Sequence, residues 1–312
     1  MKRLILGLCV HVLVIGAAPA FSEVIKLGTV APEGSPWHEI LLEAAQRWKE
    51  LSNGTVTLRI YAGGVAGDEK DMLRKIRIGQ LHAATLTSNT LIDIIPEIEV
   101  VQLPMLVRTD DELDYVMQAL IPEFEARLAK RGFRVLTWST AGWMHFFTKE
   151  PVVIFWGSDT TYMELLKSWG FNPVPLAVPD LLPSLQTGLV DSFPAPPAVA
   201  LSFQWYSLAP NMMELRWQPL PGATVVSLRQ WNKIPEELRH SLEAVARELG
   251  ARLQKQIRQL EQEAIAAMQS HGLEVIAVSP AAEEQWISLA QEQAYPVLVR
   301  SPLSKEVFQT VL

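Results

Sequence analysis

Residues 24–61 read VIKLGTVAPEGSPWHEILLEAAQRWKELSNGTVTLRIY, and this stretch decides the fold class. Its first seven residues, which are mostly apolar, read as a short buried strand. Asn53-Gly54 is a stop signal, and residues 55–61 then alternate like a second strand. Between the two strands, residues 36–51 carry apolar side chains at helical spacing: Trp37, Ile40, Leu41, Ala44, Ala45 and Trp48. The order strand, helix, strand predicts an α/β architecture in which helices cover a sheet.

The same alternation continues along the chain. Residues 67–79 are expected to form a helix and residues 81–86 a strand. Further strands are expected at 133–138 and, separately, at 144–148, and a short one at 173–176. No sequence repeat or low-complexity segment interrupts this pattern.

The longest predicted element runs from Pro235 to about His271, and Gly272 closes it. At 1.5 Å per residue such a helix is roughly 54 Å long, which is more than the width of one ordinary domain. We therefore expect it to lie along two lobes. The alternative is a projecting coiled-coil arm, but one side of the helix carries a stripe that a globular body would cover: Leu242, Val245, Leu249, Leu253, Ile257 and Leu260.

Length and composition bound the class of protein. The chain has 312 residues, 49% of them apolar and 20% charged, which is enough for a large core and about two domains. The formal net charge of −7 argues against nucleic acid as a partner, because phosphate binding requires an excess of Lys and Arg. The single cysteine, Cys9, excludes a disulfide framework, an iron–sulfur cluster and a thiolate zinc site.

Residues 1–22 have the layout of a secretory signal peptide: two basic residues, an apolar run and a small-residue stretch. The alternatives are a lipoprotein signal that uses Cys9, for which Leu8 is too bulky, and a permanent N-terminal helix. No later window approaches 18 uninterrupted apolar residues. We therefore expect an exported protein located in the periplasm.

Enzyme motifs are absent from the sequence. It contains no helical zinc-binding histidine pair, no GxSxG elbow, no phosphate-binding GxxxxGK[ST] and no dinucleotide glycine fingerprint. We therefore expect no catalytic residue, no cofactor and no bound metal. Gly63-Gly64 follows a strand and precedes a helix, so its amides could face a cleft, although taken alone a plain tight turn with an acidic helix start is the better explanation.

Several matching stretches give the chain, from Val24 to about Val278, a resemblance to a known family. It resembles the extracytoplasmic substrate-binding proteins of tripartite ATP-independent periplasmic (TRAP) transporters, the DctP-like family. The stretches that carry the resemblance are Lys26–Thr29, Gly34–Pro36, Leu58–Gly64, Ile76–Ala84, Leu103–Met105, Gly132–Leu136, Leu185–Asp191 and Trp231–Pro235.

The resemblance implies a two-lobed periplasmic-binding-protein-like fold, each lobe a sheet flanked by helices, with a long helix along both. Lobe I would comprise residues 23–142 and 222–255, and lobe II residues 143–221 and 256–312. The implied function is to capture a small organic solute between the closing lobes and to deliver it to the membrane subunits of a TRAP permease.

The chain also departs from the family pattern. About ten residues before Trp156 are missing, together with an arginine that typically holds a ligand carboxylate, and a second arginine is replaced around residues 143–145. The pattern resembles the subgroup associated with a tetratricopeptide-repeat partner, so a largely apolar or amphipathic ligand is expected. The expected ligand-binding residues are Trp143, His145, Trp156, Phe203, Gln204, Trp205, Tyr206, Gly64 and Trp37.

Other interpretations stay open at this point. Each of these aromatic residues could instead be a packed core residue. The protein could be a periplasmic enzyme on the same scaffold, with His145 and a nearby carboxylate as acid and base, or a protein-binding or sensory module. The shortened segment before Trp156 could also impair the second lobe.

Overall fold

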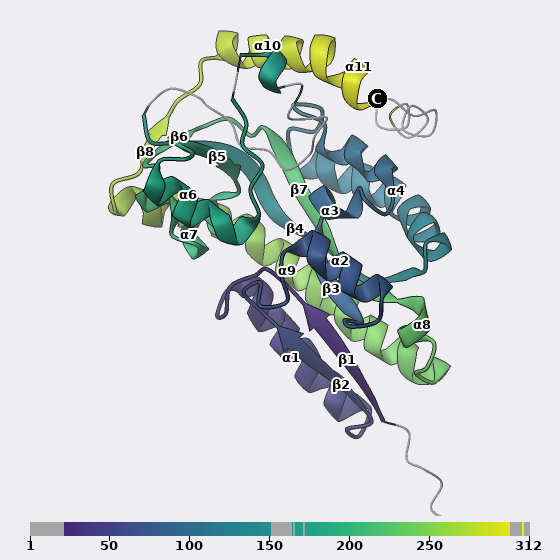
Figure 1. The fold of residues 1–312 in the computed structure, drawn as a ribbon. Coiled ribbons are helices and arrows are strands. Elements are labelled where there is room, and N and C mark those ends of the chain that lie inside the picture. Colours follow the sequence, from purple (N-terminus) through teal and green to yellow (C-terminus); the bar gives the residue numbers. More distant parts are fainter. Residues whose placement is uncertain (1–21, 151–163, 165, 171, 300–307, 309–312) are drawn as a thin grey trace, which may run out of the picture.

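A computed structural model describes residues 22–150, 164, 166–170, 172–299 and 308. The strands form one sheet in the order β2-β1-β3-β7-β4-β6-β8, and β5 pairs with β4 outside this path. Figure 1 shows the sheet extending through both halves of the molecule. The strands are β1 (Glu23–Gly28), β2 (Val56–Tyr61), β3 (Ala83–Thr87), β4 (Phe133–Thr148), β5 (Ser192–Ala195), β6 (Asn211–Met213), β7 (Gln218–Ser227) and β8 (Glu274–Ile276).

The first half, lobe I, is built on β1, β2, β3 and the paired parts of β4 and β7. β1 runs parallel to both β2 and β3, as strands joined by a crossover helix require. The helices that cover this part of the sheet are α1 (Pro36–Leu51), α2 (Glu69–Arg77), α3 (Ser88–Leu91), α4 (Asp110–Lys130) and α8 (Leu228–Trp231), with the 3₁₀ helix η1 (Pro96–Gln102).

The second half, lobe II, surrounds the end of β4, which pairs with β5 and β6, while β6 also pairs with β8. Its helices and the C-terminal helices are η2 (Val178–Asp180), α6 (Leu181–Thr187), α7 (Pro197–Ser202), η3 (Trp205–Ser207), α10 (Pro280–Leu289), the π-helical turn η4 (Ala290–Ala294) and α11 (Tyr295–Leu298). This arrangement confirms the predicted two-lobed α/β fold.

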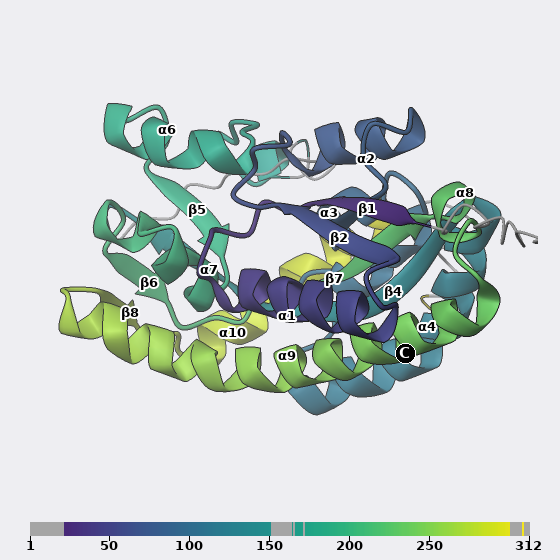
Figure 2. The ribbon, with the colours of Figure 1, turned by 90° about the horizontal axis from the view of Figure 1, so that it is seen from below.

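The long helix α9 (Glu236–Ser270) runs along both lobes, as the sequence predicted. It packs against α1 and β4 in lobe I and against α7 in lobe II. Its buried apolar side chains from Leu242 to Ala264 belong to the hydrophobic cluster that includes β1 and α1 of lobe I, whereas Met268 belongs to the lobe II core. In Figure 2 α9 lies along one side of the molecule, while α2 and α6 lie on the opposite side. The helix is therefore part of the globular body and not a projecting coiled-coil arm.

Three predicted strands differ from the structure. Residues 133–138 and 144–148 belong to one strand, β4, whose register shifts at two points instead of breaking. Gly142, with φ of +113°, lies within the second irregularity and lets the strand continue into lobe II. The strand expected at 173–176 is absent, because Pro173 and Pro175 have no amide hydrogen to donate to a neighbouring strand.

Several of the ten tryptophans are structural. Trp217, at the start of the crossing into β7, is buried and lies 5.3 Å from Trp286 of α10 and 6.3 Å from Trp169, ring centre to ring centre. The ring of Phe146 of β4 lies 5.5 Å from that of Trp217, centre to centre, and completes this cluster. Together these rings attach α10 to the strands that pass between the lobes.

Within the part of the chain that the structure describes, no helix combines the length and apolar character needed to cross a membrane.

Candidate functional site

The loops that follow β1, β2 and β3 lie at the carboxyl edge of the lobe I sheet, where α/β folds usually bind ligands. Gly63 and Gly64 form one of these loops, with φ of +62° and +75°. Their amides donate to the carbonyls of Ala31 (2.8 Å) and Thr29 (3.1 Å). These N–H groups therefore hold the loops together and are already used within lobe I.

The two lobes touch at this edge. A Cβ atom built on Gly64 would lie 3.5 Å from Cγ of Pro179 in η2 of lobe II. The Gly64 loop leads into α2 and Pro179 leads into α6, which are the elements on the side away from α9 (Figure 2). Gly64 thus faces lobe II closely enough for a single added carbon to touch it, and a larger residue would also be strained there by its positive φ.

A buried carboxyl group lies beneath the same edge. Glu69, the first residue of α2, accepts hydrogen bonds from the amide (2.9 Å) and the hydroxyl (2.8 Å) of Thr87, the last residue of β3. Burial raises the pKa of Glu69, although these hydrogen bonds act in the opposite direction. Because the Thr87 hydroxyl donates to Glu69, its oxygen remains able to accept a hydrogen bond from another group.

Trp143 lies within a group of charged side chains between the lobes. Its ring is buried, and its Nε1 donates to Oδ1 of Asp110, the first residue of α4, at 3.0 Å. The Arg216 guanidinium lies over the ring at 5.2 Å from the ring centre. Arg258 of α9 lies 3.5 Å from the same Asp110 oxygen. The sequence did not indicate these arginines, because they approach Trp143 only through the fold.

His145 is two residues further along β4 and is also buried. Its Nδ1 lies 3.1 Å from the carbonyl oxygen of Met213, and its Nε2 lies 3.5 Å from Oε1 of Glu261, a buried residue of α9. Arg216 reaches the same glutamate oxygen at 3.7 Å. The structure therefore brings Trp143 and His145 together at the junction of the lobes.

The expected aromatic group of lobe II forms a separate cluster. Trp205 is buried, stacks on Phe203 with ring centres 4.6 Å apart, and meets Phe193 edge-on at 5.4 Å. Tyr206 is half-buried against the same cluster. Gln204 is exposed and has a left-handed backbone with φ of +59°. Phe203, Trp205 and Tyr206 are thus together in the lobe II core.

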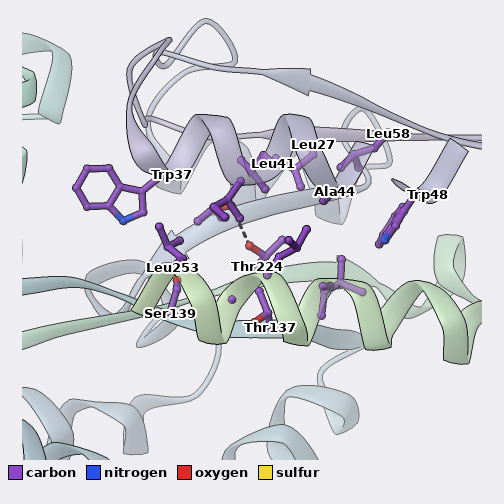
Figure 3. A pocket seen from close by; sticks show the side chains of 16 residues that line it. Leu27, Trp37, Leu41, Ala44, Trp48, Leu58, Thr137, Ser139, Thr224 and Leu253 are labelled. Carbon is purple, nitrogen blue, oxygen red and sulfur yellow. Dashed lines mark hydrogen bonds between the residues drawn. The ribbon is translucent and has the colours of Figure 1, made fainter. Parts of the chain in front are cut away.

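Trp37, the second residue of α1, belongs to a hydrophobic cluster of lobe I that is separate from the cluster of Trp143. Its Nε1 donates to the carbonyl oxygen of Thr140 at 3.3 Å. It lines a cavity of about 40 Å³ between α1, α9 and the sheet, which Figure 3 shows with Trp48, Thr137 and Thr224 nearby. A cavity of this volume can hold a few water molecules but not an organic solute. Trp156 lies outside the described residues.

Trp37, Trp143 and Trp205 belong to three different hydrophobic clusters and do not converge on one point. The polar residues around Trp143 were not predicted. The only nearby signal is Thr109, whose capping box with Glu112 places Asp110 at the first turn of α4. Among the described residues, no group of three or more His, Cys, Asp or Glu side chains could hold a metal ion.

Comparison with known proteins identifies the family. The model of the bacterial extracellular solute-binding protein family 7 (DctP) matches residues 27–155 and 156–297. The chain therefore belongs to this family of solute receptors. The family is one of binding proteins, so an enzyme with His145 as acid or base is not supported.

Individual relatives agree with this assignment. A solute-binding protein of Chromohalobacter salexigens is 25% identical over 70% of this chain and 68% of its own length. The structure is similar to a TRAP periplasmic solute-binding protein from Haemophilus influenzae with bound L-gulonate, with a TM-score of 0.86, 19% identity and coverage of 93% of this chain and 99% of that one.

A TRAP periplasmic solute-binding protein from Xanthobacter autotrophicus with bound β-D-galacturonate has a TM-score of 0.85 and 19% identity, covering 92% of this chain and 98% of that one. Both ligands are hydroxylated carboxylates. They do not support the expectation of a largely apolar ligand, which rested on arginines missing from two sequence positions.

Proposed function

We propose that this protein is the periplasmic receptor of a TRAP-type transporter and that it captures a small organic acid between its two lobes. The observation that carries the proposal is the family match across residues 27–297, which includes both lobes and α9. The sugar acids bound by structurally similar proteins support the ligand class. The loaded receptor would deliver its solute to the membrane subunits of the permease.

The edge that carries Gly64 and Thr87 is the part of lobe I that we propose to face the solute. Two features support this: Gly64 faces Pro179 of lobe II at close range, and the Thr87 oxygen can accept a hydrogen bond from a solute hydroxyl. Trp143 and Trp205 are packed inside the protein, and in this proposal they shape the lobes on which the solute-binding surface is carried.

Export and a protein partner are further parts of the proposal. Residues 1–22 have the pattern of a signal peptide, which supports a periplasmic location, although residues 1–21 lie outside the described part of the chain. A periplasmic tetratricopeptide-repeat partner is supported by the sequence resemblance alone. Mass spectrometry of proteins that co-purify with this chain from a periplasmic extract tests it.

Isothermal titration calorimetry on the mature protein tests the ligand class. D-Glucuronate, D-galacturonate and L-gulonate are titrated as the acids, with D-glucose as a neutral control of similar size. We expect saturable binding of at least one acid and none of D-glucose. Binding of D-glucose with equal affinity, or of none of the three acids, would contradict the proposed ligand class.

A further inference from the structure

The buried pair His145 and Glu261 is a feature that solute capture does not by itself explain. His145 is on β4, Glu261 is on α9, and each side chain is only 5% exposed. The distance of 3.5 Å between Nε2 and Oε1 brings the two groups face to face without a regular hydrogen bond. Such buried polar atoms usually have partners, so the protonation of this pair requires an explanation.

The contact on the other side of the imidazole fixes its tautomer. Nδ1 of His145 lies 3.1 Å from the carbonyl oxygen of Met213, and a carbonyl oxygen can only accept. Nδ1 therefore carries a hydrogen. If the ring were neutral, Nε2 would present a lone pair to an oxygen of Glu261, which would leave two acceptors opposed in a buried site. One proton must therefore lie between His145 and Glu261.

The surrounding charges determine which residue holds that proton. Arg216 approaches Oε1 of Glu261 at 3.7 Å, which favours the carboxylate form of Glu261. Contacts of 4.0 Å or less connect this pair to two further acids and a second arginine. The connected side chains are the anions Asp110, Asp114 and Glu261 and the cations Arg216, Arg258 and His145. With Glu261 in its carboxylate form, the charges balance only when His145 is positive.

These six side chains, here called the hinge cluster, join α4 of lobe I to elements that pass between the lobes. Asp110 and Asp114 are on α4, the residues Arg258 and Glu261 are on α9, and Arg216 directly precedes the crossing into β7. We propose that His145 is held as an imidazolium and that its charge completes the hinge cluster, which stabilises the lobe arrangement seen here. The hinge role rests on the proposed function, whereas the charge on His145 does not.

Nitrogen-15 NMR of histidine-labelled mature protein tests the charge directly. His145→Gln assigns the signals of His145 by their disappearance. At pH 7 we expect both ring nitrogens of His145 at the shifts of a protonated imidazolium. Glu261→Gln should release that proton and give the shifts of a neutral ring. Glu43→Gln, which breaks the exposed pair with Arg252 on the surface of α9, is the matched control and should leave the signals unchanged. A neutral His145 in the wild type would overturn the proposal.

Small-angle X-ray scattering without added solute tests the hinge role. We expect Glu261→Gln to have a larger radius of gyration than the wild type, because the lobes open, and Glu43→Gln to match the wild type. An unchanged radius in Glu261→Gln would overturn the hinge role. Failure of the proposed function would appear separately, as a lack of acid binding in calorimetry with the His145 signals unaffected. If His145→Gln does not fold, Glu261→Gln and the wild type still decide the result.

Discussion

Gly250 of α9 allows the long helix to approach the lobe I sheet, and replacing it should be costly. A Cβ atom at this position would lie 1.8 Å from Oγ1 of Thr137, 2.9 Å from Cβ of Thr137 and 3.1 Å from the carbonyl oxygen of Trp138. In Figure 3 Thr137 of β4 lies against this helix. Gly250→Ala would therefore push α9 and β4 apart where the helix packs on the lobe I sheet.

Two opposing effects set the magnitude. In an exposed helix, Gly→Ala stabilises by about 1 kcal/mol through helix propensity. Overpacking a core typically costs about 1–3 kcal/mol, and the atom at 1.8 Å belongs to a short side chain on a strand, which has little room to move. We expect a net destabilisation of about 1–2 kcal/mol, measured by urea unfolding followed by circular dichroism.

A double-mutant cycle supplies the control. Thr137→Ala removes Oγ1, so Gly250→Ala should cost about 1 kcal/mol less in that background than in the wild type, although the 2.9 Å contact between the Cβ atoms remains. Equal costs in both backgrounds would show that the two residues are not in contact. A Gly250→Ala variant more stable than the wild type would refute the close approach of α9 to β4.

Three titratable groups give predictions that unfolding measurements across pH and spectroscopy can check. Burial raises the pKa of Glu243, but the hydrogen bonds from Arg134 outweigh burial, and the net pKa is lowered. Glu243→Gln should therefore destabilise the protein at pH 7. The stability difference between wild type and variant should disappear as the pH falls below about 4. Burial raises the pKa of Glu69, so the wild type should lose stability relative to Glu69→Gln as the pH rises from about 4 to 7. Burial also raises the pKa of Tyr295 to about 12. In an ultraviolet titration, Tyr295 should therefore ionise at a higher pH than exposed tyrosines. Tyr295→Phe loses the hydrogen bond to the Pro104 carbonyl and should lower the free energy of unfolding by about 1 kcal/mol.

Local patterns in the sequence predicted the elements that do not depend on distant contacts. Helix α1 has the predicted bounds, because Ser35, Pro36 and the apolar spacing all mark it. Helix α9 differs from its prediction by one residue at each end. The course of β4 was less predictable. Its continuity depends on pairing with β7, which is about 80 residues away in the sequence and leaves no local pattern.

The candidate site was harder to predict than the fold. Tryptophans near strand ends were expected at the cleft, yet Trp143 and Trp205 are enclosed by residues from several distant elements. Composition shows that a large ring is present but not which side of a strand it occupies once the register shifts. The contact of Gly64 with Pro179 likewise joins residues from two lobes, and only the assembled structure reveals it.

Small-angle X-ray scattering of the wild-type protein with and without the acid that binds most tightly tests the central claim most directly. If the two lobes close on an organic acid, saturation should decrease the radius of gyration, or hold it at the closed value across conditions that open the free protein, while D-glucose has no effect. An acid that binds saturably without changing the lobe arrangement under any condition would contradict capture between closing lobes.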